Sequence, residues 1–138
     1  MSDAPTHSIA AILPCSDLDA STAFYEMLGL KVVSDHGTYR LLADGKGWQL
    51  HLTNESGPTW PERDQNPFGL YLYTERVAEL AERVGDRIIK REKAPTHKPW
   101  GMYEFALSDP DETLVRVGWP SELIGRPNKH PCHYVNEA

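Results

Sequence analysis

The chain has little cysteine: its 138 residues include only Cys15 and Cys132. Two cysteines are too few for the disulfide framework that holds small secreted domains together. The sequence also lacks a signal-peptide pattern and any apolar run near the ~18–20 residues that span a bilayer. These absences predict a cytoplasmic protein that makes no membrane contact. For Cys15 the sequence shows neither a partner His nor an environment that would lower the thiol pKa, so we interpret it as structural.

The chain also has few basic residues: 14 Lys and Arg stand against 20 Asp and Glu, which gives a net charge of −6, and there is no long basic run. Nucleic-acid binding normally requires clustered basic side chains, so we exclude nucleic acid as a partner. The acidic balance instead favours a neutral or cationic ligand. At 40% hydrophobic and 25% charged residues, the composition is that of one ordinary globular domain.

Apolar residues that alternate or run together predict eight strands. Two of them form a hairpin that reverses at Asp109-Pro110-Asp111, where proline fixes φ and aspartate bonds to the backbone. The expected strands include residues 8–14, 31–35, 38–43, 48–53, 69–73, 87–90, 103–107 and 115–119. We interpret residues 94–99 as a loop.

Two helices are predicted from apolar residues spaced three and four apart. Asp17 is a fitting cap for the first and Gly29 closes it; Thr74 caps the second and Gly85 closes it. The order of strand, capped helix, glycine and three strands therefore occurs twice.

This repeat predicts an α+β fold with two tandem βαβββ modules in one domain. Module one covers about 8–53, a connector 54–67, module two about 68–119 and an irregular tail 120–138. We expect each sheet to be curved and mixed, with its helix on the apolar back and a ligand cleft between the concave faces.

Two segments carry a resemblance to a known family. The first strand leads into Asp17, Phe24-Tyr25 and Leu28-Gly29, and the later segment holds Trp100-Gly101 and Asp109-Pro110-Asp111 around Phe-Ala-Leu. In this order they resemble the glyoxalase, bleomycin-resistance and extradiol-dioxygenase (vicinal oxygen chelate) superfamily, and most of all its bleomycin-resistance proteins.

The resemblance covers nearly everything from Ile9 to Trp119 and implies the fold of two βαβββ modules around a ligand cleft. Glu112 departs from the pattern, because the family usually has Gly or Asn at this point of the turn. The departure concerns the type of turn and leaves the fold unchanged.

The resemblance also bears on metal binding. Enzymes of this superfamily hold a divalent metal with His and Glu side chains on four strands, and the equivalent positions here are Ala10, His51, Gly69 and Arg116. Only His51 could be a ligand, whereas a catalytic site usually needs three, and Arg116 adds a fixed positive charge. The segment 130–133 also holds His and Cys but has no second cluster. We expect no metal and no other cofactor.

Alternation places His51 and Arg116 on the cleft faces of their strands, and it places several aromatic side chains on the same faces. Aromatic residues beside a few polar groups suit a flat, heteroaromatic ligand. Glu104 would supply an acid to a cationic ligand, while Trp48 and Trp119 are assigned to the core. The expected ligand-binding residues are Gln49, His51, Trp60, Phe68, Tyr71, Tyr73, Trp100, Met102, Glu104 and Arg116.

Three functions fit these residues. In the first, a homodimer with clefts shared between chains sequesters an aromatic, cationic antibiotic or metabolite and performs no chemistry. In the second, a divergent lyase or oxygenase uses a non-standard metal site or an acid-base pair such as His51 with Glu104. In the third, a structural interaction module fills the cleft with its own side chains. Turnover, or metal bound at stoichiometric level, would indicate the enzyme.

Overall fold

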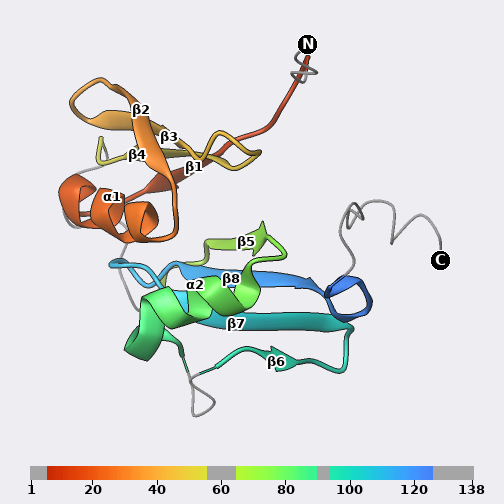
Figure 1. Ribbon diagram of the computed structural model, residues 1–138. Helices are drawn as coiled ribbons and strands as arrows, with labels where there is room; N and C mark the ends of the chain where they lie inside the picture. The colour runs from red at the N-terminus through yellow and green to blue at the C-terminus, as the bar shows by residue number, and fades with distance from the viewer. Residues whose placement is uncertain (1–5, 56–64, 90–93, 126–138) are drawn as a thin grey trace. The chain divides into compact units, whose positions relative to one another are not determined.

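The computed structural model describes residues 6–55, 65–89 and 94–125. The chain divides into two compact units, Met1–Gln65 and Asn66–Ala138, and each is described by itself. The division lies within the predicted connector 54–67. Each unit has a strand, a helix and three further strands, in that order (Figure 1). The α+β fold of two βαβββ modules is confirmed.

Unit one is a four-stranded mixed sheet with one helix. It contains β1 (Ala11–Pro14), α1 (Leu18–Met27), β2 (Lys31–Asp35), β3 (Tyr39–Ala43) and β4 (Gln49–Thr53). The strands lie in the order β1-β4-β3-β2, and only the β1–β4 pair is parallel. Leu42, Leu50 and Leu52 are buried on the face that α1 covers, while His51 alternates to the opposite face.

The ends of α1 follow the predicted signals. The Asp17 side chain accepts a hydrogen bond from the Ala20 backbone N–H at 3.0 Å, which confirms the cap. At the other end Gly29 has φ 109°, and the N–H groups of Gly29 and Leu30 donate to the carbonyls of Glu26 and Tyr25. These two bonds form a Schellman motif, which requires the left-handed backbone that glycine adopts easily.

Unit two repeats the arrangement. It contains β5 (Gly69–Tyr73), α2 (Val77–Val84), β6 (Thr96–His97), β7 (Met102–Ser108) and β8 (Leu114–Pro120), in the sheet order β5-β8-β7-β6. Short 3₁₀ turns occupy Gly85–Arg87 and Ser121–Leu123.

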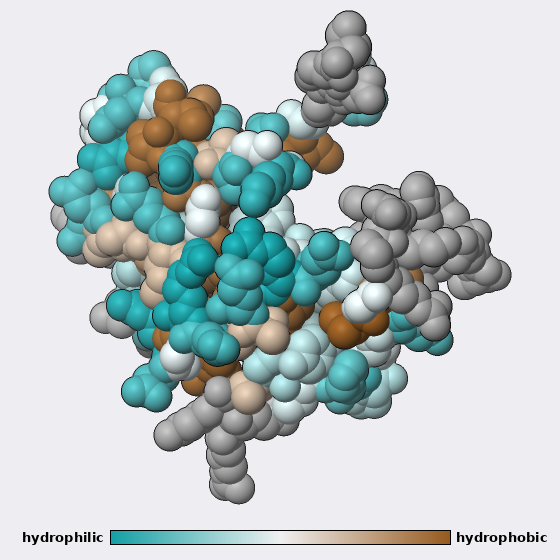
Figure 2. All heavy atoms as spheres, viewed as in Figure 1, coloured by the Kyte–Doolittle hydropathy of each residue, from teal (hydrophilic) through white to brown (hydrophobic). Residues whose placement is uncertain are grey.

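The core of unit two lies between α2 and one face of its sheet. Figure 1 shows α2 in front of the strands, and Figure 2 shows mainly hydrophilic residues over the outer side of this helix. The inner residues of α2 meet alternate residues of β7 and β8, so the opposite face of the sheet carries the remaining side chains. The buried residues are Val77, Leu80, Ala81, Val84, Phe105, Leu107, Val115, Val117 and Trp119.

The sixth strand differs from the prediction. Ile88 forms an isolated bridge to Leu107, the Ile89 backbone N–H donates to the Ala106 carbonyl, and the 3₁₀ turn already includes Arg87. Lys90 lies outside the described residues. The strand β6 instead lies at Thr96–His97, inside the predicted loop 94–99. The two isoleucines gave a strand-like signal because Ile88 is buried in the core, with 7% exposure. A buried apolar pair does not reveal whether a sheet ladder continues.

Two smaller predictions also fail. Thr74 does not cap α2: the N-cap position is Arg76, without a side-chain cap bond, and the Thr74 hydroxyl accepts the Arg76 backbone N–H at 3.2 Å. Trp48, assigned to the core, is only half-buried, because it immediately precedes β4 at the end of a turn. By contrast Trp119 is buried, as predicted.

Candidate ligand-binding site

The buried carboxylate of Glu104, on β7, is the centre of the candidate site. Its Oε2 accepts a hydrogen bond from Arg116 Nη1 at 2.7 Å, and its Oε1 accepts one from the Tyr71 hydroxyl at 2.7 Å and one from Trp100 Nε1 at 3.2 Å. Glu104 is 1% exposed. Four of the predicted site residues therefore form one hydrogen-bonded group, here termed the Glu104 cluster.

Strand register explains why these side chains meet. Arg116 on β8 lies opposite Tyr71 on β5, and Glu104 on β7 lies opposite Gly118, two residues further along β8. Residues two apart on a strand share a face, so all three side chains project from the side opposite α2. Trp100 reaches the cluster from the turn that precedes β7.

Gly118 provides the space that the cluster needs. A Cβ atom at this position would overlap with the Tyr71 hydroxyl and would lie 2.8 Å from the Cβ of Glu104. The tyrosine hydroxyl can therefore approach Glu104 only because residue 118 has no side chain. The alternation that places Arg116 on the cleft face also places Gly118 there, but this role of Gly118 depends on the register of β5, which the sequence alone does not show.

The charges of the cluster are balanced internally. Arg116 compensates the negative charge of Glu104, so this carboxylate is not an open acid for a cationic ligand. Burial, together with the hydrogen bond to Glu104, raises the pKa of Tyr71 well above its ordinary value. The Tyr71 phenol is consequently a neutral donor at neutral pH. The cluster is an electrostatically satisfied wall.

A pocket of about 280 Å³ lies beside this wall within unit two. One part of its lining is apolar and includes Ile88, Ala106 and Leu114, while Arg116 and Lys98 contribute positive charge. Trp100 and Glu104 also line it. Trp100 is 61% exposed despite its bond to Glu104, so most of the indole is accessible from the pocket side or from solvent.

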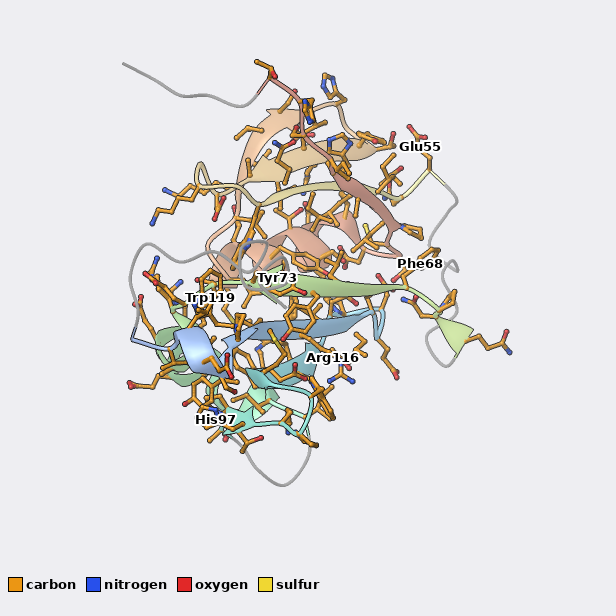
Figure 3. All side chains as sticks on the ribbon, turned by 90° about the vertical axis from the view of Figure 1, so that its right-hand side faces the viewer. Glu55, Phe68, Tyr73, His97, Arg116 and Trp119 are labelled. Atoms are coloured by element: carbon orange, nitrogen blue, oxygen red, sulfur yellow. The ribbon has the colours of Figure 1, made fainter. Side chains whose placement is uncertain are left out.

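Besides Tyr71, three predicted residues of unit two lie outside the lining of this pocket. Tyr73 is 49% exposed and its ring centroid is 4.6 Å from that of Tyr71. Phe68 and Tyr73 lie at opposite ends of β5 (Figure 3), and Met102 begins β7 half-buried. Sequence reasoning placed these residues in the site, but they do not line the pocket.

The predicted residues of unit one form a separate group. His51 Nδ1 shares a hydrogen bond of 2.8 Å with the Tyr39 hydroxyl, and Gln49 Nε2 donates to Ser8 Oγ at 3.2 Å. Sequence reasoning missed Tyr39, although alternation along 38–43 would have placed it on one face with Leu41. Trp60 lies outside the described residues.

The residues at the family's metal positions do not fit a divalent cation. Ala10 and Gly69 offer no side-chain ligand, and the Arg116 guanidinium would place its own positive charge against the ion. His51 contributes a single imidazole whose Nδ1 already contacts Tyr39. Over 6–55, 65–89 and 94–125, no three His, Cys, Asp or Glu side chains are grouped so as to hold a metal.

Two tandem βαβββ modules, each a four-stranded mixed sheet with one helix, define the class of fold. The chain belongs to the Glyoxalase/Bleomycin resistance protein/Dioxygenase superfamily, whose family model matches residues 7–117. The family predicted from the two sequence segments is therefore confirmed. No curated protein sequence matches the chain.

Solved structures place the fold among binding proteins and enzymes alike. A bleomycin-binding protein in complex with bleomycin is 26% identical, with a TM-score of 0.69 over 83% of this chain and 98% of that one. TnmS3, an antibiotic-binding protein from Streptomyces sp. CB03234, is 26% identical, with a TM-score of 0.65 over 87% and 100%. Lactoylglutathione lyase from Agrobacterium tumefaciens is 22% identical, with a TM-score of 0.63 over 86% and 96%. The last likeness concerns the fold alone.

Membrane insertion through a helix finds no support in the described ranges, where neither α1 nor α2 has the length and apolar character of a membrane span.

Proposed function

We propose that this protein binds and sequesters a small aromatic molecule without a metal and without converting it. The observation that carries the proposal is the pocket beside the Glu104 cluster, where an exposed indole is anchored next to apolar side chains. The likeness to two antibiotic-binding structures at 26% identity supports the same class of ligand. The proposed setting is the cytoplasm.

Trp100 is suited to stacking because one edge of its ring is fixed. Its Nε1–H donates to Glu104, while 61% of the side chain remains accessible. A fixed aromatic face loses little side-chain entropy when a flat ligand packs on it, and stacking adds about 1 kcal/mol beyond area burial. Trp100 is therefore the residue on which affinity should depend most.

The cluster is poorly suited to acid-base chemistry at neutral pH. The Glu104 carboxylate is paired with Arg116 and the Tyr71 phenol has a raised pKa, so neither group is an available acid or base. The enzyme alternative would draw on His51 or on a relocated metal. Its test is product analysis by mass spectrometry after long incubation with each bound compound, combined with elemental analysis of the protein.

A two-fold dimer with shared clefts completes the proposal. In each unit the sheet face opposite the helix carries an exposed apolar side chain, Ile12 at 56% and Tyr73 at 49%. Such faces and the adjoining sheet edges need cover, which a second copy of the chain would supply. Light scattering at micromolar concentration should give the mass of two chains. A monomer that still binds ligand would contradict the shared cleft.

The binding test compares wild type with Trp100→Ala against a panel of glycopeptide, quinoxaline and mitomycin-like compounds by calorimetry. We expect the truncation to weaken binding roughly ten- to hundred-fold, the equivalent of ~1–3 kcal/mol. The thermal midpoint should change little, because the indole is mostly exposed.

Trp48→Ala serves as the matched control, since Trp48 is a half-buried tryptophan of unit one. It should leave affinity unchanged. A large fall in the midpoint of Trp100→Ala with unchanged affinity would instead assign Trp100 to the core, where such a truncation costs ~3–5 kcal/mol.

A further inference from the structure

The Arg116 guanidinium is only partly used by the protein. Its Nη1 donates to Glu104, its side chain is 37% exposed, and it lines the pocket of unit two. Over the described ranges, Nε and Nη2 make no hydrogen bond. Arginine carries five N–H donors in a planar fork that matches a carboxylate, so most of this capacity remains at the pocket wall.

The charged residues that line the pocket are two basic ones, Arg116 and Lys98, and one acidic one, Glu104, although the whole chain is acidic. Glu104 and Arg116 compensate each other, and Lys98 adds a further positive side chain to the lining. Charges beyond about 8–10 Å are largely screened at physiological salt, so the net charge of −6 does not decide what this pocket attracts. The lining therefore disfavours the cationic ligand that overall composition suggested.

We propose that the pocket of unit two binds a flat aromatic carboxylate, with the carboxylate on Arg116, Lys98 nearby and the ring between the Trp100 indole and the apolar wall. The inference rests on the proposed function and names the class of its ligand. The apolar wall includes Ile88 and Leu114. At about 280 Å³ the pocket lies at the lower end of ligand-site sizes, which favours one or two fused rings.

The test uses three naphthalene probes of similar size whose polar groups differ in charge: 2-naphthoate, 2-naphthamide and 2-naphthylmethylammonium. Calorimetric titration of the wild-type chain should show naphthoate binding roughly 10- to 100-fold more tightly than the amide, the range of a charge-assisted hydrogen bond. The ammonium compound should bind most weakly. This comparison needs no variant.

A double variant then assigns the preference to the cluster. Glu104→Gln with Arg116→Gln removes both charges together and leaves no uncompensated ion in the wall. It should lose the preference for naphthoate, so that naphthoate and the amide bind with similar affinity. Arg83→Gln makes the same substitution on an exposed residue of α2 and should retain the preference.

The outcomes separate the two proposals. Equal affinity for naphthoate and the amide, or tighter binding of the ammonium compound, would overturn the carboxylate assignment and leave aromatic binding intact. A naphthoate preference that survives in a folded double variant would also overturn it. If wild type binds none of the three probes while it binds the antibiotic panel, the pocket assignment fails and the proposed function stands. If it binds neither set, both fail.

Discussion

The two units place different chemistry at equivalent positions of the same sheet. In unit one Tyr39 lies opposite Thr53 and Leu41 lies opposite His51; in unit two Glu104 lies opposite Gly118 and Ala106 lies opposite Arg116. By register, Tyr39 corresponds to Glu104 and His51 to Arg116. The hydrogen bonds follow the same diagonal in both units: Tyr39 bonds to His51, and Glu104 bonds to Arg116.

The backbone repeat therefore fixes where a polar pair forms, and the side chains decide what kind of pair it is. The parallel strands differ in the same way, because His51 has Ile12 as its β1 partner and Arg116 has Tyr71 on β5. Tyr71 reaches across to Glu104, which is the reason that β8 needs Gly118, whereas β4 accommodates Thr53 at the equivalent position. A neutral pair in one unit is replaced by an ion pair with additional donors in the other.

The largest expected effect on the free energy of unfolding comes from removing the Glu104 carboxylate of unit two. Glu104→Ala would leave Arg116 and the Tyr71 and Trp100 donors without their acceptor, and breaking a buried ion pair costs about 3–5 kcal/mol. We expect the lower end of this range, because the Arg116 side chain is 37% exposed. Urea unfolding provides the measurement.

Tyr39→Phe is the matched change in unit one. It removes one neutral hydrogen bond to His51 and should cost about 1 kcal/mol. Equal losses of unfolding free energy for Glu104→Ala and Tyr39→Phe would mean that the ion pair stabilises unit two no more than the Tyr39–His51 pair stabilises unit one. The proposed difference between the two units would then be wrong.

Adding a side chain at residue 118 should have the next largest effect on stability. Gly118→Ala forces the Tyr71 hydroxyl away from Glu104, and overpacking of this kind costs about 1–3 kcal/mol. Tyr71→Phe removes the overlapping oxygen, so the double variant should recover part of the loss in a double-mutant cycle. Thr53→Ala, at the equivalent position of unit one, should cost less than Gly118→Ala. Additive losses for Gly118→Ala and Tyr71→Phe would refute the steric explanation.

Much of this arrangement could be predicted from alternation alone. Apolar residues at every second position correctly placed Val115 and Val117 against a helix and Arg116 on the other face. The capping signals of Asp17 and Gly29 fixed the ends of α1, because those bonds are made within a few residues of sequence. Local signals therefore sufficed for elements and faces.

The remainder depended on register between strands, which local patterns do not determine. The pairing of Glu104 with Arg116 and the approach of Tyr71 to Gly118 are contacts across strands distant in sequence. For the same reason the sequence predicted an open acid at Glu104, since nothing near it in the chain shows that Arg116 compensates its charge. The short strand β6 was missed because two residues carry too little pattern.

The smallest expected effect concerns the turns that join the last two strands of each unit. Asp44 Oδ1 accepts the backbone N–H groups of Lys46 and Trp48, and Asp109 Oδ1 accepts those of Asp111 and Thr113. The two aspartates thus organise their turns identically. Three residues after each of them, unit one has Gly47 with φ 139°, whereas unit two has Glu112 with φ 63°.

Glu112 is the one non-glycine residue with positive φ in the described ranges, at the position where its sequence already departed from the family pattern. A left-handed backbone costs an L-residue with a side chain roughly 1–2 kcal/mol. Glycine avoids this steric cost, but part of the gain is offset because glycine loses more conformational entropy on folding. Glu112→Gly should therefore stabilise the protein by about 0.5–1 kcal/mol in urea unfolding. Glu112→Ala removes the same carboxylate but keeps a Cβ, so it should give no gain. Equal stabilisation by both variants would show that charge at residue 112, and not backbone conformation, distinguishes this turn from its counterpart at Gly47.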